Sequence, residues 1–242
     1  LATAILSLVP PWSRVMTIED APEIKIPIEY WTRTTIREYG EQKIGVFDLV
    51  KTSIRLSLDY IIIGEIRGEE AREWANAILL GHGAITTFHA ESPESALIRL
   101  VSPPISVDPQ VVNLLNVFIK TNLIEVHPGR QVYRHEVYVH EDARVKPLFI
   151  YDRVLDRIVL SAQYREKDIL SELKFIEKVC NARRVSKDTL KEEYKAMINT
   201  LTSIYKEYSS LDPLLDKPSY IDLPRILYNK LYTYLTLRAK SD

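Results

Sequence analysis

The sequence is poor in cysteine and has no excess of positive charge. Its 242 residues include one cysteine, Cys180, which excludes an internal disulfide and a multi-cysteine zinc site and suits a reducing compartment. The 32 Lys and Arg residues are balanced by 33 Asp and Glu residues, which argues against nucleic acid as a dedicated partner. No apolar run approaches the roughly 20 residues of a membrane-spanning helix, and no signal-peptide pattern is present.

Strand-like and helix-like segments alternate over the first 130 residues. Apolar runs at 15–18, 60–63 and 84–88 predict buried strands, and apolar residues at helical spacing predict helices at 47–58 and 69–80. Ser92-Pro93 and Asp108-Pro109 are typical helix starts, because a capping side chain precedes a proline at the first helical position. This alternation predicts an α/β fold with a parallel sheet that is covered on both faces.

The pattern changes after about residue 130. Alternating residues at 131–140, with short runs at 149–150 and 158–160, predict an antiparallel ribbon. The chain from residue 168 is expected to be helical, with apolar stripes at 169–180 and 190–208 and a last helix over 223–237. We therefore predict an α/β core over residues 1–165 and a helical C-terminal extension over residues 166–242.

Acidic and histidine side chains follow directly on the three apolar strands. Glu19 and Asp20 end the first strand, Glu65 follows the second after Gly64, and His89 follows the third. Ligands of open α/β sheets bind beyond the carboxyl ends of the strands, so these side chains are expected at one edge. Two carboxylates there can hold a hydrated Mg²⁺ and orient a water toward a phosphate.

Each of these residues also has a simpler explanation. Arg67 can pair with phosphate, but it can equally pair with an acid of the site. His82 and His89 do not have the spacing of helix-borne metal ligands, and each can be a structural histidine. The acidic pair at 19–20 can be a solvated strand end. Spacing alone thus indicates a nucleotide-type α/β fold with its site at the strand ends.

Three motifs resemble those of the type II/type IV secretion ATPase superfamily. Residues 15–24 (VMTIEDAPEI) resemble its Asp box, residues 59–68 (DYIIIGEIRG) its atypical Walker B motif, and residues 81–92 (GHGAITTFHAES) its His box. They occur in the family's order and at its approximate spacing, and the resemblance covers residues 1 to about 140. The continuation at 95–105 is most similar to the archaeal branch, which includes flagellum and pilus assembly motors.

The resemblance implies a RecA-like parallel-sheet ATPase core and gives roles to matching residues. Glu19 would be the general base or water-positioning group, and Glu65 the Walker B glutamate at Mg²⁺ and the attacking water. His89 would sense the terminal phosphate. Further residues implied for the nucleotide site are Asp20, Arg67 and His82. Arginines that bridge subunits or stabilise transferred charge in the family match Arg33, Arg37 and Arg67.

The resemblance also implies cofactors and partners. These are ATP with Mg²⁺, further copies of the chain in a ring that is expected to be a hexamer, and a polytopic membrane platform protein. The expected location is cytoplasmic, at the periphery of the membrane. Two other functions stay open: a non-catalytic docking or oligomerisation module of the same fold, and a DNA-transfer ATPase of conjugation type. The motifs do not distinguish flagellum, pilus, secretion and uptake machines.

One element of the family has no counterpart in the printed sequence. The Walker A loop, G-x-x-x-x-G-K-[ST], supplies most phosphate contacts through its backbone amides and lysine. The first glycine here is Gly40, and the first methionine, Met16, lies inside an apolar run. In the family, the segment that residues 1–6 resemble directly follows the loop. We interpret the chain as the C-terminal portion of a longer ATPase.

The printed chain is therefore expected to bind ATP–Mg²⁺ weakly or not at all, and a version with its native upstream segment to bind it in a Mg²⁺-dependent way. Acidic groups repel ATP unless the metal and the cations of the loop offset them. Calorimetric titration of both versions measures the difference. Micromolar affinity in the printed chain would refute this interpretation. Equal absence of binding in the extended version would favour the non-catalytic module.

Overall fold

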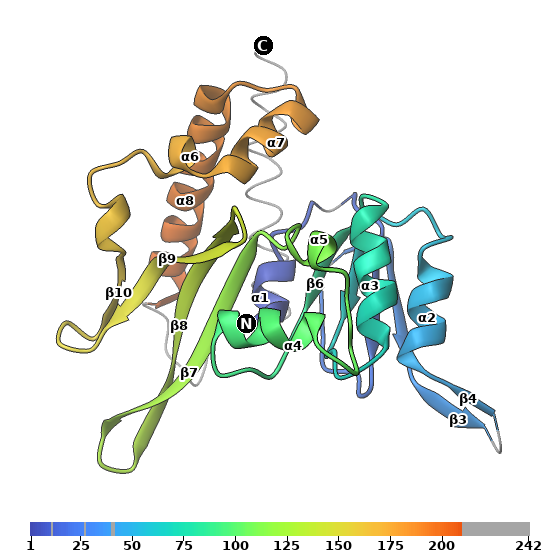
Figure 1. The fold of residues 1–242 in the computed structure, drawn as a ribbon. Helices are drawn as coiled ribbons and strands as arrows, with labels where there is room; N and C mark the ends of the chain where they lie inside the picture. Colours follow the sequence, from blue (N-terminus) through green and yellow to red (C-terminus); the bar gives the residue numbers. More distant parts are fainter. Residues whose placement is uncertain (11, 27, 40–41, 210–242) are drawn as a thin grey trace. The chain divides into compact units, whose positions relative to one another are not determined.

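The computed structural model of the chain describes residues 1–10, 12–26, 28–39 and 42–209, with the side chains at 37–39, 42–43 and 208–209 outside the description. The helix predicted over 223–237 also lies outside it. Contacts divide the described chain into two compact units, coloured by sequence in Figure 1. The first unit contains Leu1–Thr87 and the described residues from Lys191 on, and the second contains Phe88–Leu190.

A four-stranded parallel sheet forms the centre of the first unit (Figure 1). Its strands, in spatial order, are β2 (Trp31–Thr35), β1 (Val15–Glu19), β5 (Tyr60–Ile63) and β6 (Gly83–Thr86). The central strand β1 is buried along its whole length, and so is most of β5. This burial explains their continuous apolar sequences. The predicted α/β fold class with a parallel sheet is confirmed.

Both faces of this sheet are covered. Side chains alternate between the faces along a strand, so Val15 and Ile62 share one face. There they pack in one buried cluster with Leu6 of α1 (Ala2–Leu6) and with Ile24, Ile26 and Ile28. The opposite face carries Ile61 and Ile63, which are also fully buried. Two further helices pack against the sheet and lie side by side: α2 (Val46–Ser53) and α3 (Glu70–Leu79) (Figure 1).

The sequence prediction missed the strands between residues 31 and 44. These are β2, paired in parallel with β1, and the antiparallel hairpin of β3 (Arg37–Tyr39) and β4 (Gln42–Ile44). The sequence of β2, WTRTT, contains no apolar run, because this strand lies at the edge of the sheet and its residues are partly or fully exposed. Its β-branched threonines are the signal that was available.

The second unit is built around a four-stranded antiparallel sheet. Its strands, in spatial order, are β10 (Arg157–Leu160), β9 (Arg144–Asp152), β8 (Arg130–Glu141) and β7 (Val117–His127). The short helices α4 (Pro93–Val101) and α5 (Pro109–Val112) precede it. After it come the 3-10 turn η1 (Ala162–Tyr164), α6 (Ile169–Glu172) and α7 (Lys174–Arg183). The predicted antiparallel ribbon is confirmed.

Helix ends follow the predicted capping chemistry. The side chain of Ser92 accepts a hydrogen bond from the Ser95 amide at 3.2 Å, and Asp108 accepts one from the Gln110 amide at 2.7 Å. Helix α3 ends at Leu79, and Gly81, two residues later, has a φ of +94° in the left-handed region that favours glycine. These local signals allowed the starts of α4 and α5 and the end of α3 to be predicted from the sequence.

The first predicted apolar stripe packs into the core of the second unit with its residues buried or half-buried, and the second stripe is buried only in part. Ile176 and Cys180 of α7 pack with Val139 and Leu148 of the second unit's sheet. In the long helix α8 (Lys187–Ser209), Leu190 and Ile204 are buried. In contrast, Tyr194 is 36% exposed, Ile198 59% and Tyr205 73%, so these three residues of the second stripe are not buried. The domain boundary at 165/166 stays a prediction. Among the described residues, no helix has the length and apolarity needed to cross a membrane.

Gly83 packs directly against the ring of Tyr60, and this contact predicts a stability effect. A Cβ at position 83 would lie 2.5 Å from Cδ1 and 2.6 Å from Cε1 of that ring, and 3.2 Å from the Asp59 carbonyl oxygen. Burial, followed by the charge of Asp59, raises the pKa of Tyr60, which stays neutral. Gly83→Ala is expected to destabilise the chain by about 1–3 kcal/mol, because the ring must move.

Urea unfolding of Gly83→Ala measures this cost. The same change in a Tyr60→Ala background serves as the control, because the ring is then gone and the two effects should not add. Equal costs of the glycine substitution in both backgrounds would contradict the packing explanation.

Candidate functional site

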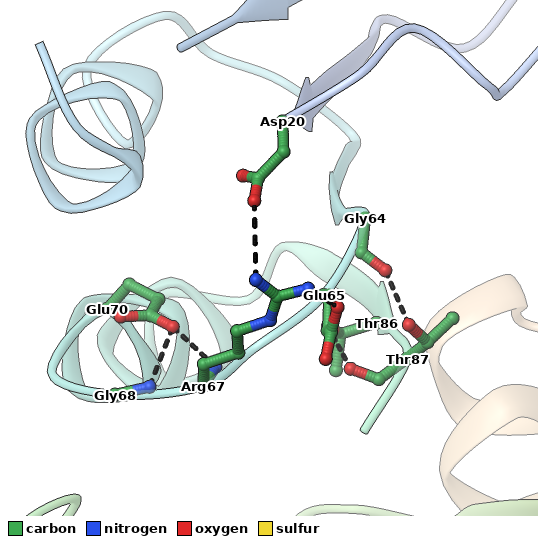
Figure 2. A network of polar contacts seen from close by, with 8 residues as sticks. All are labelled: Asp20, Gly64, Glu65, Arg67, Gly68, Glu70, Thr86 and Thr87. Atoms are coloured by element: carbon green, nitrogen blue, oxygen red, sulfur yellow. Dashed lines mark hydrogen bonds and ion pairs between the residues drawn. The ribbon is translucent and has the colours of Figure 1, made fainter. Parts of the chain in front are cut away.

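The carboxyl edge of the parallel sheet brings together the segments that follow β1, β5 and β6. The Gly64 amide, just after β5, donates to the Ile18 carbonyl of β1 at 2.8 Å. On the other side, Thr87 donates its hydroxyl to the Gly64 carbonyl at 2.6 Å and accepts from the Ile66 amide at 3.1 Å. Figure 2 shows Gly64 and Thr87 joined in this way. The turn that carries Glu65 is thus fixed to both neighbouring strands.

Glu19, the last residue of β1, is a buried carboxylate. Its side chain is 2% exposed. Oε2 accepts two backbone hydrogen bonds, from the Glu23 amide at 2.8 Å and from the Ile24 amide at 2.7 Å. Oε1 has no hydrogen-bond partner among the described residues. Burial of a carboxylate is costly without partners, so Glu19 both needs the segment at 23–24 and holds it in place.

Arg33 of β2 closes a ring of contacts around Glu19. Its Nε lies 3.4 Å from Glu19 Oε1, and its Nη2 donates to the Ile24 carbonyl. The guanidinium also lies over the Trp31 ring, 4.4 Å from the ring centroid. Trp31 in turn donates its indole N–H to the Thr17 hydroxyl at 3.0 Å. Strand β2 thus contributes a cation that is held inside the first unit against the loop that follows β1.

Glu65, Arg67 and Asp20 form an ionic network at the same edge (Figure 2). Arg67 Nη2 lies 2.5 Å from Glu65 Oε2, and Nη1 lies 3.8 Å from Asp20 Oδ2. The Glu65 side chain is 22% exposed, whereas Asp20 and Arg67 are largely exposed. The hydrogen bond to Glu65 raises the pKa of Arg67 above its usual value, so Arg67 stays charged. The structure therefore brings Glu65 and Asp20 together through an arginine.

The two histidines lie elsewhere. His82 precedes β6, and its Nδ1 lies 2.6 Å from the Leu58 carbonyl oxygen, just before β5. Because β5 and β6 are parallel, this places His82 at the amino end of the sheet, at the opposite end from Glu65. Its part in a nucleotide site stays a prediction. His89 belongs to the second unit, where its side chain is exposed and its carbonyl accepts from Arg99.

Several residues that organise this edge were missed or given other roles in the sequence analysis. Arg33, which matches arginines that bridge subunits or stabilise transferred charge in the family, forms an ion pair within the chain here. The side chain of Arg37 lies outside the description. Trp31 and Thr87 had no assigned role. Trp31 and Arg33 could have been found from their spacing. An aromatic residue and an arginine two positions later lie on the same face of a strand, where they can stack.

The acidic residues of this edge fit part of a Mg²⁺ site. Among the described residues, no group of three or more Asp, Glu, His or Cys side chains could hold a metal ion by itself. Mg²⁺ in nucleotide sites is normally bound by one or two carboxylates together with waters and phosphate oxygens. Glu65, with Asp20 nearby, matches the protein share of such a site. A phosphate ligand would have to supply the remaining contacts.

Comparisons with known proteins identify relatives of the chain. Residues 1–126 match the family model described as "Type II/IV secretion system protein". An uncharacterized protein of Methanocaldococcus jannaschii, MJ1287, is 34% identical over 169 residues, which are 68% of this chain and 59% of that protein. VirB11 of Agrobacterium fabrum is 30% identical over 105 residues, which are 42% of this chain and 30% of VirB11. The chain thus spans less than two thirds of these relatives.

Solved structures show a partial likeness. The VirB11 ATPase of the Brucella suis type IV secretion system is 24% identical, with a TM-score of 0.45, over 57% of this chain and 44% of that one. The pilus retraction motor PilT with bound ADP is 22% identical, with a TM-score of 0.46, over 59% of this chain and 42% of that one. The assignment depends instead on the family model, which covers 126 of 242 residues. The chain belongs to the type II/IV secretion system protein family.

Proposed function

We propose that the native protein hydrolyses ATP with Mg²⁺ and drives a secretion- or pilus-type assembly machine, with Glu65 facing the metal and the attacking water. One observation supports this most. Glu65 follows a strand buried on both faces and presents a partly exposed carboxylate at the edge where α/β sheets bind ligands. The turn that carries it is hydrogen bonded to β1 and to the residue that follows β6, so the carboxylate is held in position.

Mg²⁺, when bound, would neutralise the phosphate charge that develops during transfer. The chain's own part is to supply carboxylate oxygens and to orient water. Glu65 is suited to both, because its side chain is reachable yet ordered by Arg67. Asp20 is too exposed and too loosely paired for a fixed role, and we assign it to the outer, water-bridged side of the metal.

Glu19 is proposed to act from a position that is more buried than that of Glu65. Its Oε2 is occupied by two backbone amides, so a water-positioning role falls to Oε1, which lies 3.4 Å from Arg33 Nε. The same carboxylate also fixes the loop that carries Asp20. The role of His89 as a sensor of the terminal phosphate stays a prediction, since His89 belongs to the other unit.

The relatives suggest the kind of machine. VirB11 and PtlH are named among type IV secretion proteins, and PilT is named as a pilus retraction motor. We propose for this chain a ring of six copies at the cytoplasmic face of a membrane, working with a polytopic platform protein. The M. jannaschii relatives agree with the resemblance to the archaeal branch, where flagellum and pilus motors belong.

Glu65→Gln is the direct test of the metal assignment. In the native protein the variant is expected to retain ATP but to lower kcat by roughly 10² to 10⁴-fold, because a lost base or metal contact has that effect. Steady-state phosphate release and nucleotide binding measure the two properties. Glu29→Gln, an exposed glutamate before β2, is the matched control and should behave as the wild type. Near-normal turnover in Glu65→Gln would remove Glu65 from the mechanism.

Glu19→Gln should behave differently from Glu65→Gln, since it should also destabilise the fold. The amide has one acceptor oxygen for the two backbone donors, so its NH₂ group faces the Arg33 guanidinium, donor against donor. We expect a loss of about 1–3 kcal/mol in the free energy of unfolding. Urea denaturation beside Glu29→Gln checks this, and identical midpoints would contradict a structural role for Glu19.

A further inference from the structure

Arg67 combines an exposed side chain with two acidic partners. It is 69% exposed, yet its guanidinium spans Glu65 Oε2 at 2.5 Å and Asp20 Oδ2 at 3.8 Å. Figure 2 shows the guanidinium between the carboxylates. Ion pairs as exposed as this are weak and are screened by salt. The contact therefore orders the carboxylates without holding the arginine permanently.

The backbone at Arg67 is fixed, in contrast to its side chain. Glu70, in the first turn of α3, accepts hydrogen bonds from the Arg67 amide at 2.5 Å and from the Gly68 amide at 2.8 Å on one oxygen, Oε1. One residue earlier, the Ile66 amide donates to the Thr87 carbonyl at 3.1 Å. Movement of the guanidinium is thus rotation of a side chain about an anchored Cα, which requires no rearrangement of the turn.

A cation in this place must compete with a divalent metal. Glu65 and Asp20 are like charges at one edge, and the Arg67 charge offsets their mutual repulsion. A metal ion that binds Glu65 meets the guanidinium as a like charge and requires the same carboxylate oxygens. A compact divalent ion interacts more strongly with a carboxylate than an exposed guanidinium does.

Building on the proposed function of Glu65, we propose that Arg67 is a displaceable counter-cation that occupies Glu65 in the metal-free state and is released when a divalent ion binds. Arg67 then acts as a positioning residue for Glu65. It keeps the carboxylate ordered and directed along the sheet edge before the metal arrives, and it lowers the affinity for metal that arrives without an accompanying anion. Once released, the guanidinium lies beside the metal on an anchored backbone, within reach of an anion bound to that metal.

Mn²⁺ titration of the nucleotide-free native protein tests this, with free Mn²⁺ followed by electron paramagnetic resonance. Arg67→Gln is expected to tighten Mn²⁺ binding by about two- to fivefold, the range that one exposed ion pair supplies. Arg67→Lys keeps the charge and should stay near the wild-type affinity. Arg55→Gln removes an equal charge from the exposed chain before β5, at the opposite end of the sheet, and should leave the affinity unchanged.

The effect must also pass through Glu65. In a Glu65→Gln background, Mn²⁺ binding should be weaker, and the added Arg67→Gln change should no longer tighten it, because the competing pair is absent. Thermal unfolding of each variant verifies that the fold is retained. Suppose that Glu65→Gln weakens Mn²⁺ binding and that Arg67→Gln alone leaves the affinity unchanged or lowers it. The counter-cation proposal for Arg67 is then wrong, and the assignment of Glu65 to the metal stands. Unaltered Mn²⁺ binding in Glu65→Gln would overturn the metal assignment and the counter-cation with it.

Discussion

The burial of the Glu19 carboxylate is the constraint on which the rest of the first unit's edge depends. A charge at the end of a wholly buried strand is tolerated only with donors close by. Here the amides at 23–24 donate hydrogen bonds to the carboxylate, and the guanidinium of Arg33 forms an ion pair with it. Satisfying them determines the path of the loop after β1, and it draws β2 against β1 as the edge strand. That path sets the position of Asp20, which is one of the two acidic partners of Arg67.

Two carboxylates at one sheet edge therefore have different surroundings. Glu19 is buried and contacts both backbone amides and the Arg33 side chain. It cannot change partners without disturbing the loop that follows β1. Glu65 is partly exposed, and the side chain of its arginine partner is largely exposed to solvent. A site that has to exchange a metal needs one group of each kind: a fixed group that keeps the scaffold in register, and a group whose partner can leave. The α/β sheet supplies both because adjacent parallel strands end at the same level.

The sequence predicted those parts of the molecule that depend on local patterns. The strands at 15–18 and 60–63 are apolar because both faces of the sheet are covered. Ser92 and Asp108 indicate helix starts because their side chains accept hydrogen bonds from amides of the first helical turn. Strand β2 could not be found in this way, since an edge strand has no continuous apolar run and its pairing with β1 is a long-range contact. Gly83 lies in the segment that resembles the His box, a functional motif. The structure gives a steric reason for glycine at this position, because a Cβ there would collide with the Tyr60 ring. The end of the sheet at which His82 lies could not be predicted for a related reason: a motif gives order along the chain, whereas the direction of β6 decides which end of the sheet a residue occupies.

Thr87 is the last residue of the first unit's N-terminal segment, and two of its polar groups are hydrogen bonded to the turn that carries Glu65. The covalent path into the second unit thus starts from a point attached to Gly64 and Ile66. Tension applied to the chain at Phe88 is resisted first by these two hydrogen bonds, before any strand of the parallel sheet is loaded. Force that passes along the chain between Thr87 and Phe88 would therefore act directly on the turn that carries Glu65.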